Sequence, residues 1–380
     1  MPIHITDAVT QTWWAILTLS AALLLTLRRK QVSALTKDAT HELKGFAILA
    51  VLFAHIGYAL VDDPRFLYPL SISAGVAVNL FLFLSGYGLA QSSAREPLST
   101  GAFYEKRLRG LFTPFWIALI GVLLLDAARI GRTYPASEVI QALFGIFPRA
   151  DLSQNINSPL WYFTFIIGHY LLFPLIYRRE RPLVSALAFA AISLTLLSFS
   201  WQVMEGVLPL YRLHALAFPV GVFAAGLTQR FGTRRETLLA RWQKWEERAN
   251  RQGFLLRLGG TLFLLIPFVF LSLNAAIGQG VWREQGASLV TMAVVLLLFL
   301  VKPVESRFLK WMGAYSYEIY LLHWPLLSRH DGLYGRLPAS LATVGWVGIL
   351  LGLGVALQRL VKRLNGSGTR TTSSEMMRDG

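Results

Sequence analysis

Cysteine is absent from this chain of 380 residues, and charged residues make up only 15% of it. The first absence excludes disulfides, thiolate metal ligands and a cysteine nucleophile. The second excludes an ordinary soluble domain, in which about 25% of the residues are charged. HExxH, P-loop and GxSxG motifs are also missing, so the signatures of zinc proteases, phosphate-binding loops and serine hydrolases are not present.

Long apolar stretches dominate the chain instead, and 54% of the residues are hydrophobic. Eleven of these stretches approach or reach the length that crosses the hydrocarbon core of a bilayer. They predict an all-α fold, namely a polytopic transmembrane helical bundle of about 10–11 spans. The expected spans are residues 11–27, 43–60, 73–91, 110–127, 158–177, 183–200, 211–229, 258–274, 286–301, 311–328 and 339–357.

The basic residues predict how the bundle is oriented. There are 36 Lys and Arg against 21 Asp and Glu, and 28 of the 36 fall in alternate loops and in the carboxyl-terminal tail. Cytoplasmic loops carry such an excess. We therefore expect a multi-pass protein of the cell (inner) membrane, with its amino end outside and its carboxyl end in the cytoplasm. The basic stretch 229–257 is expected to lie along the lipid headgroups. No nucleic-acid-binding motif accompanies the net charge of +15, so the lipid bilayer is an expected partner and nucleic acid is not.

Lys44 and His55 lie eleven residues apart on one predicted helix. At 100° per residue this separation is about three turns, so the two side chains share a face and lie about 16 Å apart along the axis. A Lys at the inner membrane surface therefore places His55 near mid-bilayer, where an ionisable group is costly and commonly functional. The alternative is a snorkelling Lys and a His that bonds to a neighbouring helix.

Five motifs follow one another along the chain. The first is Lys44, ten residues and His55, within LKGFAILAVLFAH, and the second is NLFLFLSGYG from Asn79. The third is FYEKRLR followed by PFW, the fourth is LWY with YLLFP, and the fifth is GAYSYEIYLLHWP. In this order the motifs resemble the integral-membrane acyltransferase 3 family, whose members O-acylate extracytoplasmic glycans. Asn79 stands where many members carry an acid.

The resemblance implies a membrane O-acyltransferase that moves an acyl group, acetyl in particular, from cytoplasmic acyl-CoA to a hydroxyl of an extracytoplasmic saccharide or lipid-linked saccharide. Acyl-CoA is then a co-substrate, and neither a permanently bound cofactor nor a metal is expected. His55 is the expected general base, with an acyl-histidine relay as the alternative. The implied roles are catalytic for His55, Glu318 and His323, donor-binding for Lys44, Lys106, Arg107 and Arg109, and supporting for Ser85, Trp161, Ser316, Tyr317 and Tyr320.

Each of these roles has a plainer alternative. Basic loop residues set topology, Ser, Tyr and His bond between membrane helices, and Trp and Tyr collect at the interfaces. His169 and His214 lie outside the five motifs, so packing or interhelical bonding is expected for both. The Ser85-Gly86 pair, which lacks the surroundings of a nucleophile elbow, is expected to let two helices approach closely.

The chain is predicted to divide into three parts. Residues 1–42 form an accessory first transmembrane span and a basic cytoplasmic linker, 43–358 form the acyltransferase membrane domain, and 359–380 form a basic, disordered cytoplasmic tail. Two other functions fit the same composition. One is a secondary transporter or flippase that uses intramembrane His and Glu for proton coupling, although no internal repeat is present. The other is a non-catalytic membrane partner of a biosynthetic assembly.

Overall fold

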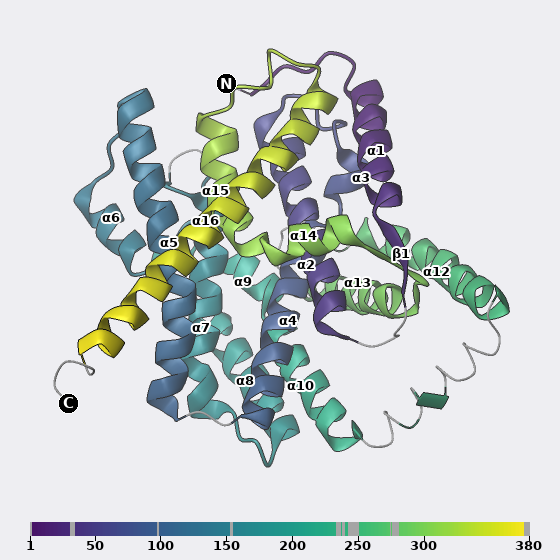
Figure 1. Ribbon diagram of the computed structural model, residues 1–380, viewed down its shortest axis with the longest axis vertical. Coiled ribbons are helices and arrows are strands. Elements are labelled where there is room, and N and C mark those ends of the chain that lie inside the picture. The colour runs from purple at the N-terminus through teal and green to yellow at the C-terminus, as the bar shows by residue number, and fades with distance from the viewer. Residues whose placement is uncertain are drawn as a thin grey trace.

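The computed structural model of this chain is a bundle of helices (Figure 1). It describes residues 2–30, 35–96, 99–152, 155–232, 251–273 and 281–375, together with Thr237, Ala240, Arg241 and Ala275. Within these ranges the sheet is confined to two short antiparallel strands, β1 (Leu27–Arg29) and β2 (Val304–Ser306). The predicted all-α fold class is therefore confirmed.

By length and composition, nine helical segments of the described residues can cross a membrane. They are α1 (Ala8–Leu25), α2 (Lys37–His55) with the π-helical turn η1 (Ile56–Leu60), α3 (Tyr68–Ser71) with α4 (Ala74–Arg95), α5 (Thr100–Ile130), η2 (Ser158–Leu160) with α7 (Trp161–Ile176), α9 (Leu208–His214) with α10 (Ala217–Arg230), α12 (Arg251–Ser272), α13 (Trp282–Val301) and α16 (Ala339–Glu375). The remaining helices are α6 (Ala136–Leu143), α8 (Pro182–Ser198), η3 (Gln202–Met204), α14 (Arg307–Ala314) and α15 (Ser316–Arg329).

Each of the eleven predicted spans falls on described helices, but the spans predicted over 211–229 and 311–328 are each divided between two helices, the first between α9 and α10. The stretch predicted as a span over 311–328 consists of α14 and α15, which meet at Tyr315. α14 packs on α2, and α15 then packs beside α16 (Figure 1). Glu318 consequently lies in the first turn of α15, not well inside a continuous helix as the sequence suggested.

Glycine residues set the closest helix contacts of the bundle. A Cβ atom at Gly45 of α2 would collide with the backbone of Leu309, and one at Gly313 of α14 would collide with the backbone of His41. The same holds for Gly86 of α4, which lies against the carbonyl of Phe218 in α10. Small residues allow such approach between membrane helices. The expected role of Gly86 in close packing is therefore confirmed, and α2 and α4 are held at the centre of the bundle.

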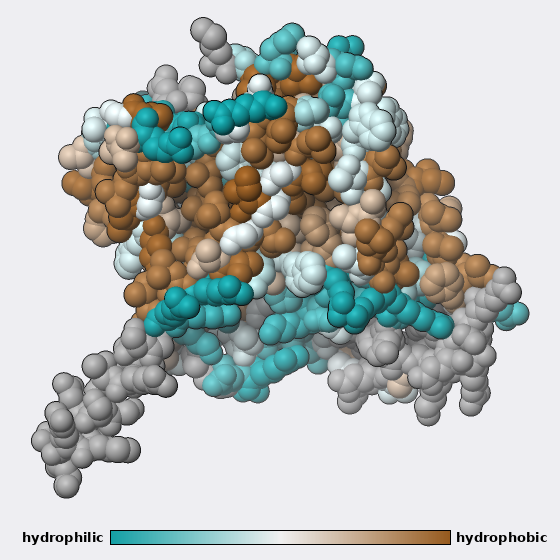
Figure 2. All heavy atoms as spheres, turned by 45° about the horizontal axis from the view of Figure 1, so that its top comes forward, coloured by the Kyte–Doolittle hydropathy of each residue, from teal (hydrophilic) through white to brown (hydrophobic). Residues whose placement is uncertain are grey.

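The surface of the molecule matches a multi-pass membrane protein. Figure 2 shows a broad apolar belt with hydrophilic side chains gathered along its borders. Large apolar side chains of α12 such as Phe263, Ile266 and Phe270 are about 70% exposed, which is costly in water and favourable in lipid.

A buried ionic cluster joins the amino-terminal segment to the rest of the bundle. The carboxylate of Glu42 accepts hydrogen bonds from Lys302 Nζ at 2.7 Å and from the backbone N–H of Ser306 at 2.5 Å. Lys30 donates to the carbonyl of Phe299 at 2.5 Å, at the carboxyl end of α13, where a cation also complements the helix dipole. Burial, and then the neighbouring Lys302 and Arg257, lowers the pKa of Lys30 to about 8.

The predicted division into three parts stays a prediction. α1 packs against α16, and β1 pairs with β2, so residues before 43 contact the larger domain. The predicted tail, 359–380, overlaps α16 up to Glu375, and its last five residues lie outside the described ones. The segment expected along the headgroups, 229–257, lies mostly outside them as well.

Candidate functional site

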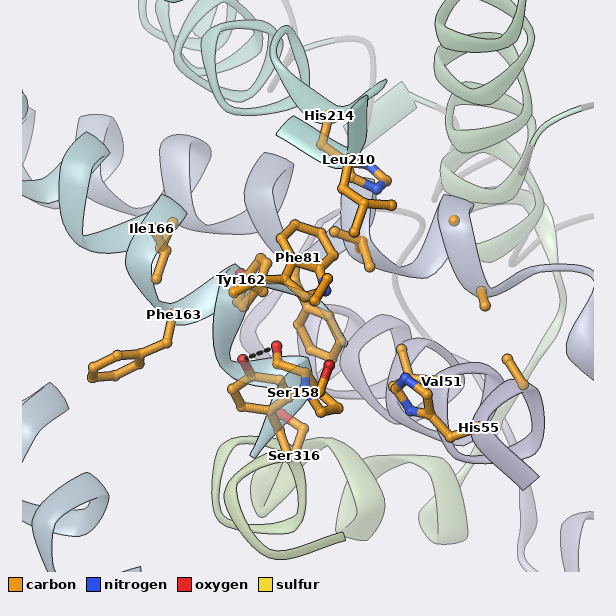
Figure 3. Close-up of a pocket in the computed structure, with 18 of the residues that line it drawn as sticks. Val51, His55, Phe81, Ser158, Tyr162, Phe163, Ile166, Leu210, His214 and Ser316 are labelled. Atoms are coloured by element: carbon orange, nitrogen blue, oxygen red, sulfur yellow. Dashed lines mark hydrogen bonds between the residues drawn. The ribbon is translucent and has the colours of Figure 1, made fainter. Parts of the chain in front are cut away.

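A cavity of about 450 Å³ lies between α2, α4, α7, α9 and α15. Apolar and aromatic side chains make up most of its wall, as is usual for ligand sites. Figure 3 shows side chains from these elements converging on it. Seven residues singled out from the sequence line it, namely Lys44, His55, Ser85, Trp161, Ser316, Tyr317 and Tyr320.

One face of α2 runs along much of the cavity. Lys44, Val51 and His55 line the wall, and Tyr58 and Ala59 of η1 continue it. The prediction that Lys44 and His55 share a face is confirmed, because both line the same cavity. His55 is the last residue of α2, and the π-helical turn η1 begins at the next residue. Single π-helical turns inside helices frequently mark functional sites.

His55 pairs with His323 across the contact between α2 and α15. The Nδ1 atom of His55 lies 3.0 Å from Nε2 of His323, and Nδ1 of His323 lies 2.8 Å from the carbonyl oxygen of Tyr320. A carbonyl only accepts, so Nδ1 of His323 must donate, and Nε2 of the neutral ring accepts from Nδ1–H of His55. With the hydrogen bonds in these directions, the free lone pair of the His55 ring is on Nε2, the ring nitrogen without a partner among the described residues.

The loop that precedes α7 is tied to α15 by side chains that bond to backbone carbonyls. Tyr320 donates to Pro159 at 2.7 Å, and Trp324 donates to Leu152 at 3.3 Å. Asn157 donates in the other direction, to the carbonyl of Leu321, at 2.9 Å. These bonds hold the loop, which lines one end of the cavity, in a fixed position on the helix that carries His323.

The hydroxyl groups that line the cavity differ in whether they donate a hydrogen bond to a backbone carbonyl. Tyr317 donates to the carbonyl of Leu111 at 2.7 Å, Tyr320 donates to Pro159, and Ser316 donates to Gly313 at 3.0 Å. Ser158 lines the cavity and is 1% exposed, yet its hydroxyl has no partner in the described part of the chain. A buried polar group without a partner is uncommon in a folded protein and calls for an explanation.

Glu318 does not line the cavity. It is 7% exposed and lies close to Lys44, Gln358 and Lys362. Lys44 does line the cavity, so Glu318 interacts with a residue of the cavity wall without being part of that wall. The structure thus brings His55 and His323 together but leaves Glu318 apart from that pair, and a catalytic role for Glu318 stays a prediction.

The three basic residues at the start of α5 differ in their surroundings. Lys106 and Arg109 are exposed, whereas Arg107 is half-buried. Arg107 Nη2 donates to Ser92 Oγ at 2.8 Å, and its buried Nε has no partner within the described ranges. Arg107 also lies close enough to Tyr170, which lines the cavity, for electrostatic interaction. None of the three is among the residues that line the cavity, and a donor-binding role for them stays a prediction.

Several cavity residues were given no site role from the sequence, among them Tyr58, Phe81, Ser158, Tyr162, Tyr170 and His214. No local pattern distinguishes Ser158 or the aromatic residues from packing residues. Packing or interhelical bonding was expected for His214, and it does bond to Asn79 of α4, but it also lines the cavity. His169 is buried, bonds to the carbonyl of Phe165 in its own helix and does not line the cavity.

The chain was compared with family models, curated proteins and solved structures. A family model described as an acyltransferase domain matches residues 42–357. This range is most of the chain and includes all the residues that line the cavity. No curated protein and no solved structure matched. Among the described residues, no group of three or more His, Asp or Glu is arranged to hold a metal. The chain is thus a multi-pass membrane acyltransferase, and it belongs to the acyltransferase 3 family.

Proposed function

We propose that this protein moves an acyl group, acetyl in particular, from cytoplasmic acyl-CoA to a hydroxyl of an extracytoplasmic saccharide. Family membership supports acyl transfer. The observation that carries the proposal is the hydrogen-bonded pair of His55 and His323 at a cavity lined by α2 from Lys44 to His55. The donor and acceptor sides belong to the proposal and follow from the basic residues, which predict a cytoplasmic Lys44.

His55 is the general base of the proposed reaction. Its Nε2 takes the proton of the acceptor hydroxyl while the oxygen attacks the thioester carbonyl and the new C–O bond forms. The tetrahedral intermediate then collapses, the C–S bond breaks, and the leaving thiolate of CoA takes the proton from the His55 imidazolium. A positioned base typically contributes about 10²–10⁴-fold to such a step.

His323 is a positioning residue in this mechanism. Because its own Nδ1 donates to the carbonyl of Tyr320, its Nε2 is available to accept from His55. That bond fixes the tautomer of His55 and stabilises the imidazolium that forms during transfer. His323 is itself 0% exposed and is absent from the cavity wall, so it acts through His55.

The basic end of the cavity suits the donor. Lys44 and Tyr170 line the wall, and Arg107 is close enough to Tyr170 for electrostatic interaction. Coenzyme A carries phosphates, which Arg and Lys bind by charge-assisted hydrogen bonds. A cavity of about 450 Å³ is at the small end of the range for ligand pockets, and its apolar wall suits the uncharged pantetheine arm and the acyl group.

Ser158 is the group that we assign to the developing oxyanion. Tyr317 and Tyr320 donate their hydroxyl protons to backbone carbonyls, whereas the hydroxyl of Ser158 has no partner among the described residues. A hydroxyl donor placed where negative charge develops is worth most in a cavity that excludes water. Figure 3 shows Ser158 and His55 on different walls of the cavity, and we place the thioester between them.

The proposed function is tested on cells with and without the gene. Surface polysaccharides are released and compared by mass spectrometry for acetyl increments. The expected result is loss of the increments in cells without the gene and their return with the wild-type gene but not with His55→Ala at equal protein level. Equal acetylation in the His55→Ala cells would contradict the proposal. Solute uptake by vesicles in response to a proton gradient, without consumption of acetyl-CoA, would favour a transporter instead.

A further inference from the structure

A second histidine of the cavity, His214, is held by a chain of buried amide and hydroxyl groups. It is the last residue of α9, and its Nδ1 lies 2.7 Å from the amide oxygen of Asn79 in α4. The amide nitrogen of Asn79 donates to Ser288 Oγ of α13 at 2.7 Å. Asn79 and Ser288 are both 0% exposed, and His214 is 2% exposed. Three helices therefore fix the position of one imidazole ring.

The direction of these hydrogen bonds fixes the tautomer of His214. The amide nitrogen of Asn79 is used in the bond to Ser288, so the amide oxygen faces His214 and accepts from Nδ1–H. A neutral imidazole with its proton on Nδ1 presents a lone pair on Nε2. No described residue bonds to that atom, and His214 lines the cavity.

Neighbouring groups keep the ring of His214 in place. Trp161 stacks on it, with ring centroids 5.7 Å apart and planes inclined by 17°. Gln285 of α13 donates to the carbonyl of Arg212 at 2.9 Å and so attaches the end of α9 to α13. Figure 3 shows His214 and His55 on different sides of the cavity. The ring is thus a rigid hydrogen-bond acceptor that faces the same space as the proposed base.

We propose that His214 contacts the saccharide acceptor, and that its Nε2 accepts a hydrogen bond from a second hydroxyl of the sugar. This inference rests on the proposed function. A sugar presents neighbouring hydroxyls, so one can reach Nε2 of His55 while another binds Nε2 of His214. The contact selects which hydroxyl is acylated, because a sugar bound in another orientation leaves its hydroxyl proton or the histidine without a partner.

The position of His214 favours contact with the saccharide acceptor over contact with acyl-CoA. His214 stacks on Trp161, the first residue of α7, and the loop before α7 lines the same cavity through Ala150 and Leu152. The residues assigned to the donor lie farther along the same helices. Lys44 is eleven residues, about three turns, before His55 on α2, and Tyr170 is nine residues, about two and a half turns, after Trp161 on α7. A neutral lone pair also suits an uncharged hydroxyl better than a phosphate, whose oxygens are acceptors.

The test uses membrane vesicles, radiolabelled acetyl-CoA and surface glycan purified from cells that lack the gene. His214→Phe removes the acceptor atom and keeps an aromatic ring against Trp161. It should raise the KM for the glycan about fivefold, the effect of one lost hydrogen bond between neutral groups, and leave the KM for acetyl-CoA unchanged. His214→Gln, whose amide oxygen can stand near the place of Nε2, should recover at least half of the lost affinity. The matched control is His169→Phe, a buried histidine outside the cavity, which should keep both KM values.

The outcomes separate this inference from the proposed function. Acetyl transfer by wild-type vesicles together with an unchanged glycan KM in His214→Phe overturns the role of His214 and leaves the proposed function standing. Equal rises in both KM values overturn it as well, because they indicate a general change of the cavity. Absence of acetyl transfer by wild-type vesicles contradicts the proposed function itself. If His214→Phe does not accumulate in the membrane, His214→Gln alone decides. A glycan KM within about twofold of the wild type, together with acylation at the wild-type position of the sugar, supports the contact, and any larger rise of the glycan KM or a change in the acylated position overturns it.

Discussion

The contact between His55 and His323 makes the sharpest prediction about catalysis. His323→Phe removes the atom that accepts Nδ1–H of His55 at 3.0 Å and fills most of the same volume. One neutral hydrogen bond is worth about 1 kcal/mol, which corresponds to about a fivefold fall in rate. Loss of control over the tautomer adds to this. For metal-ligating histidines, removal of the partner that orients the ring costs about 10–100-fold, and we expect a similar loss for His55. We therefore expect kcat to fall by about 10–100-fold.

The assay measures acetyl transfer from acetyl-CoA to purified surface glycan at varied concentrations of each substrate. Because His323 does not line the cavity, both KM values should stay within about twofold of the wild type while kcat falls. His323→Gln offers an amide oxygen to Nδ1–H of His55 and should recover part of kcat. His169→Phe serves as the control for loss of a buried histidine elsewhere in the bundle. A His323→Phe enzyme with wild-type kcat would refute the positioning role.

Three further predictions concern the donor, the oxyanion and the ionic cluster. Arg107→Gln should raise the KM for acetyl-CoA by about 10–100-fold, the range for a lost charge-assisted hydrogen bond, whereas the exposed Lys106→Gln should change it less than threefold; equal effects would remove Arg107 from the donor site. Ser158→Ala should lower kcat by about 10²-fold without lowering protein abundance, and an unchanged kcat would leave the unpartnered hydroxyl without a catalytic role. Lys30, whose pKa burial lowers to about 8, is charged below that pH at a cost to the folded state. As the pH rises from about 8 to about 10.4, the folded protein releases this proton before the unfolded chain does, so stability should rise by up to about 1.4 kcal/mol per pH unit. The difference in unfolding temperature between the wild type and Lys30→Met should follow that rise, and a difference that does not vary with pH would contradict it.

Much of the fold follows from hydropathy, because a bilayer leaves few solutions for an apolar stretch of about 20 residues. All eleven predicted spans fall on helices for this reason. The break at Tyr315 was not foreseen, although Gly313 and Ser316 lie beside it, because isolated Gly and Ser residues are also common within membrane helices. It arises from tertiary packing, because α14 follows α2 across the contact of Gly45 and Gly313 while α15 packs on α16.

The site was foreseen where its residues repeat along one helix face. Lys44 and His55 share the cavity because eleven residues make about three turns, and Ser316 and Tyr320, which the fifth motif suggested, also line it. Contacts between residues far apart in the sequence had no such signal. The chain from His214 to Asn79 and Ser288 joins three helices and depends on how they pack, and the unpartnered hydroxyl of Ser158 depends on a loop.

The separate position of Glu318 has a similar cause. Its place in the fifth motif, two residues after Ser316, suggested a shared site with His55 and His323. Because α15 begins at Ser316, successive residues of its first turn point in different directions, and Glu318 lies beside Gln358 of α16 while Ser316 and Tyr317 line the cavity.

The central claim is that one imidazole, that of His55, removes the proton of the acceptor hydroxyl. The most direct measurement is the single-turnover rate of acetyl transfer from acetyl-CoA to purified surface glycan by wild-type and His55→Gln protein in vesicles of the same lipid composition. A fall of at least about 10²-fold, with unchanged KM values and unchanged unfolding temperature, is the predicted result. A rate in His55→Gln within about twofold of the wild type would contradict the account.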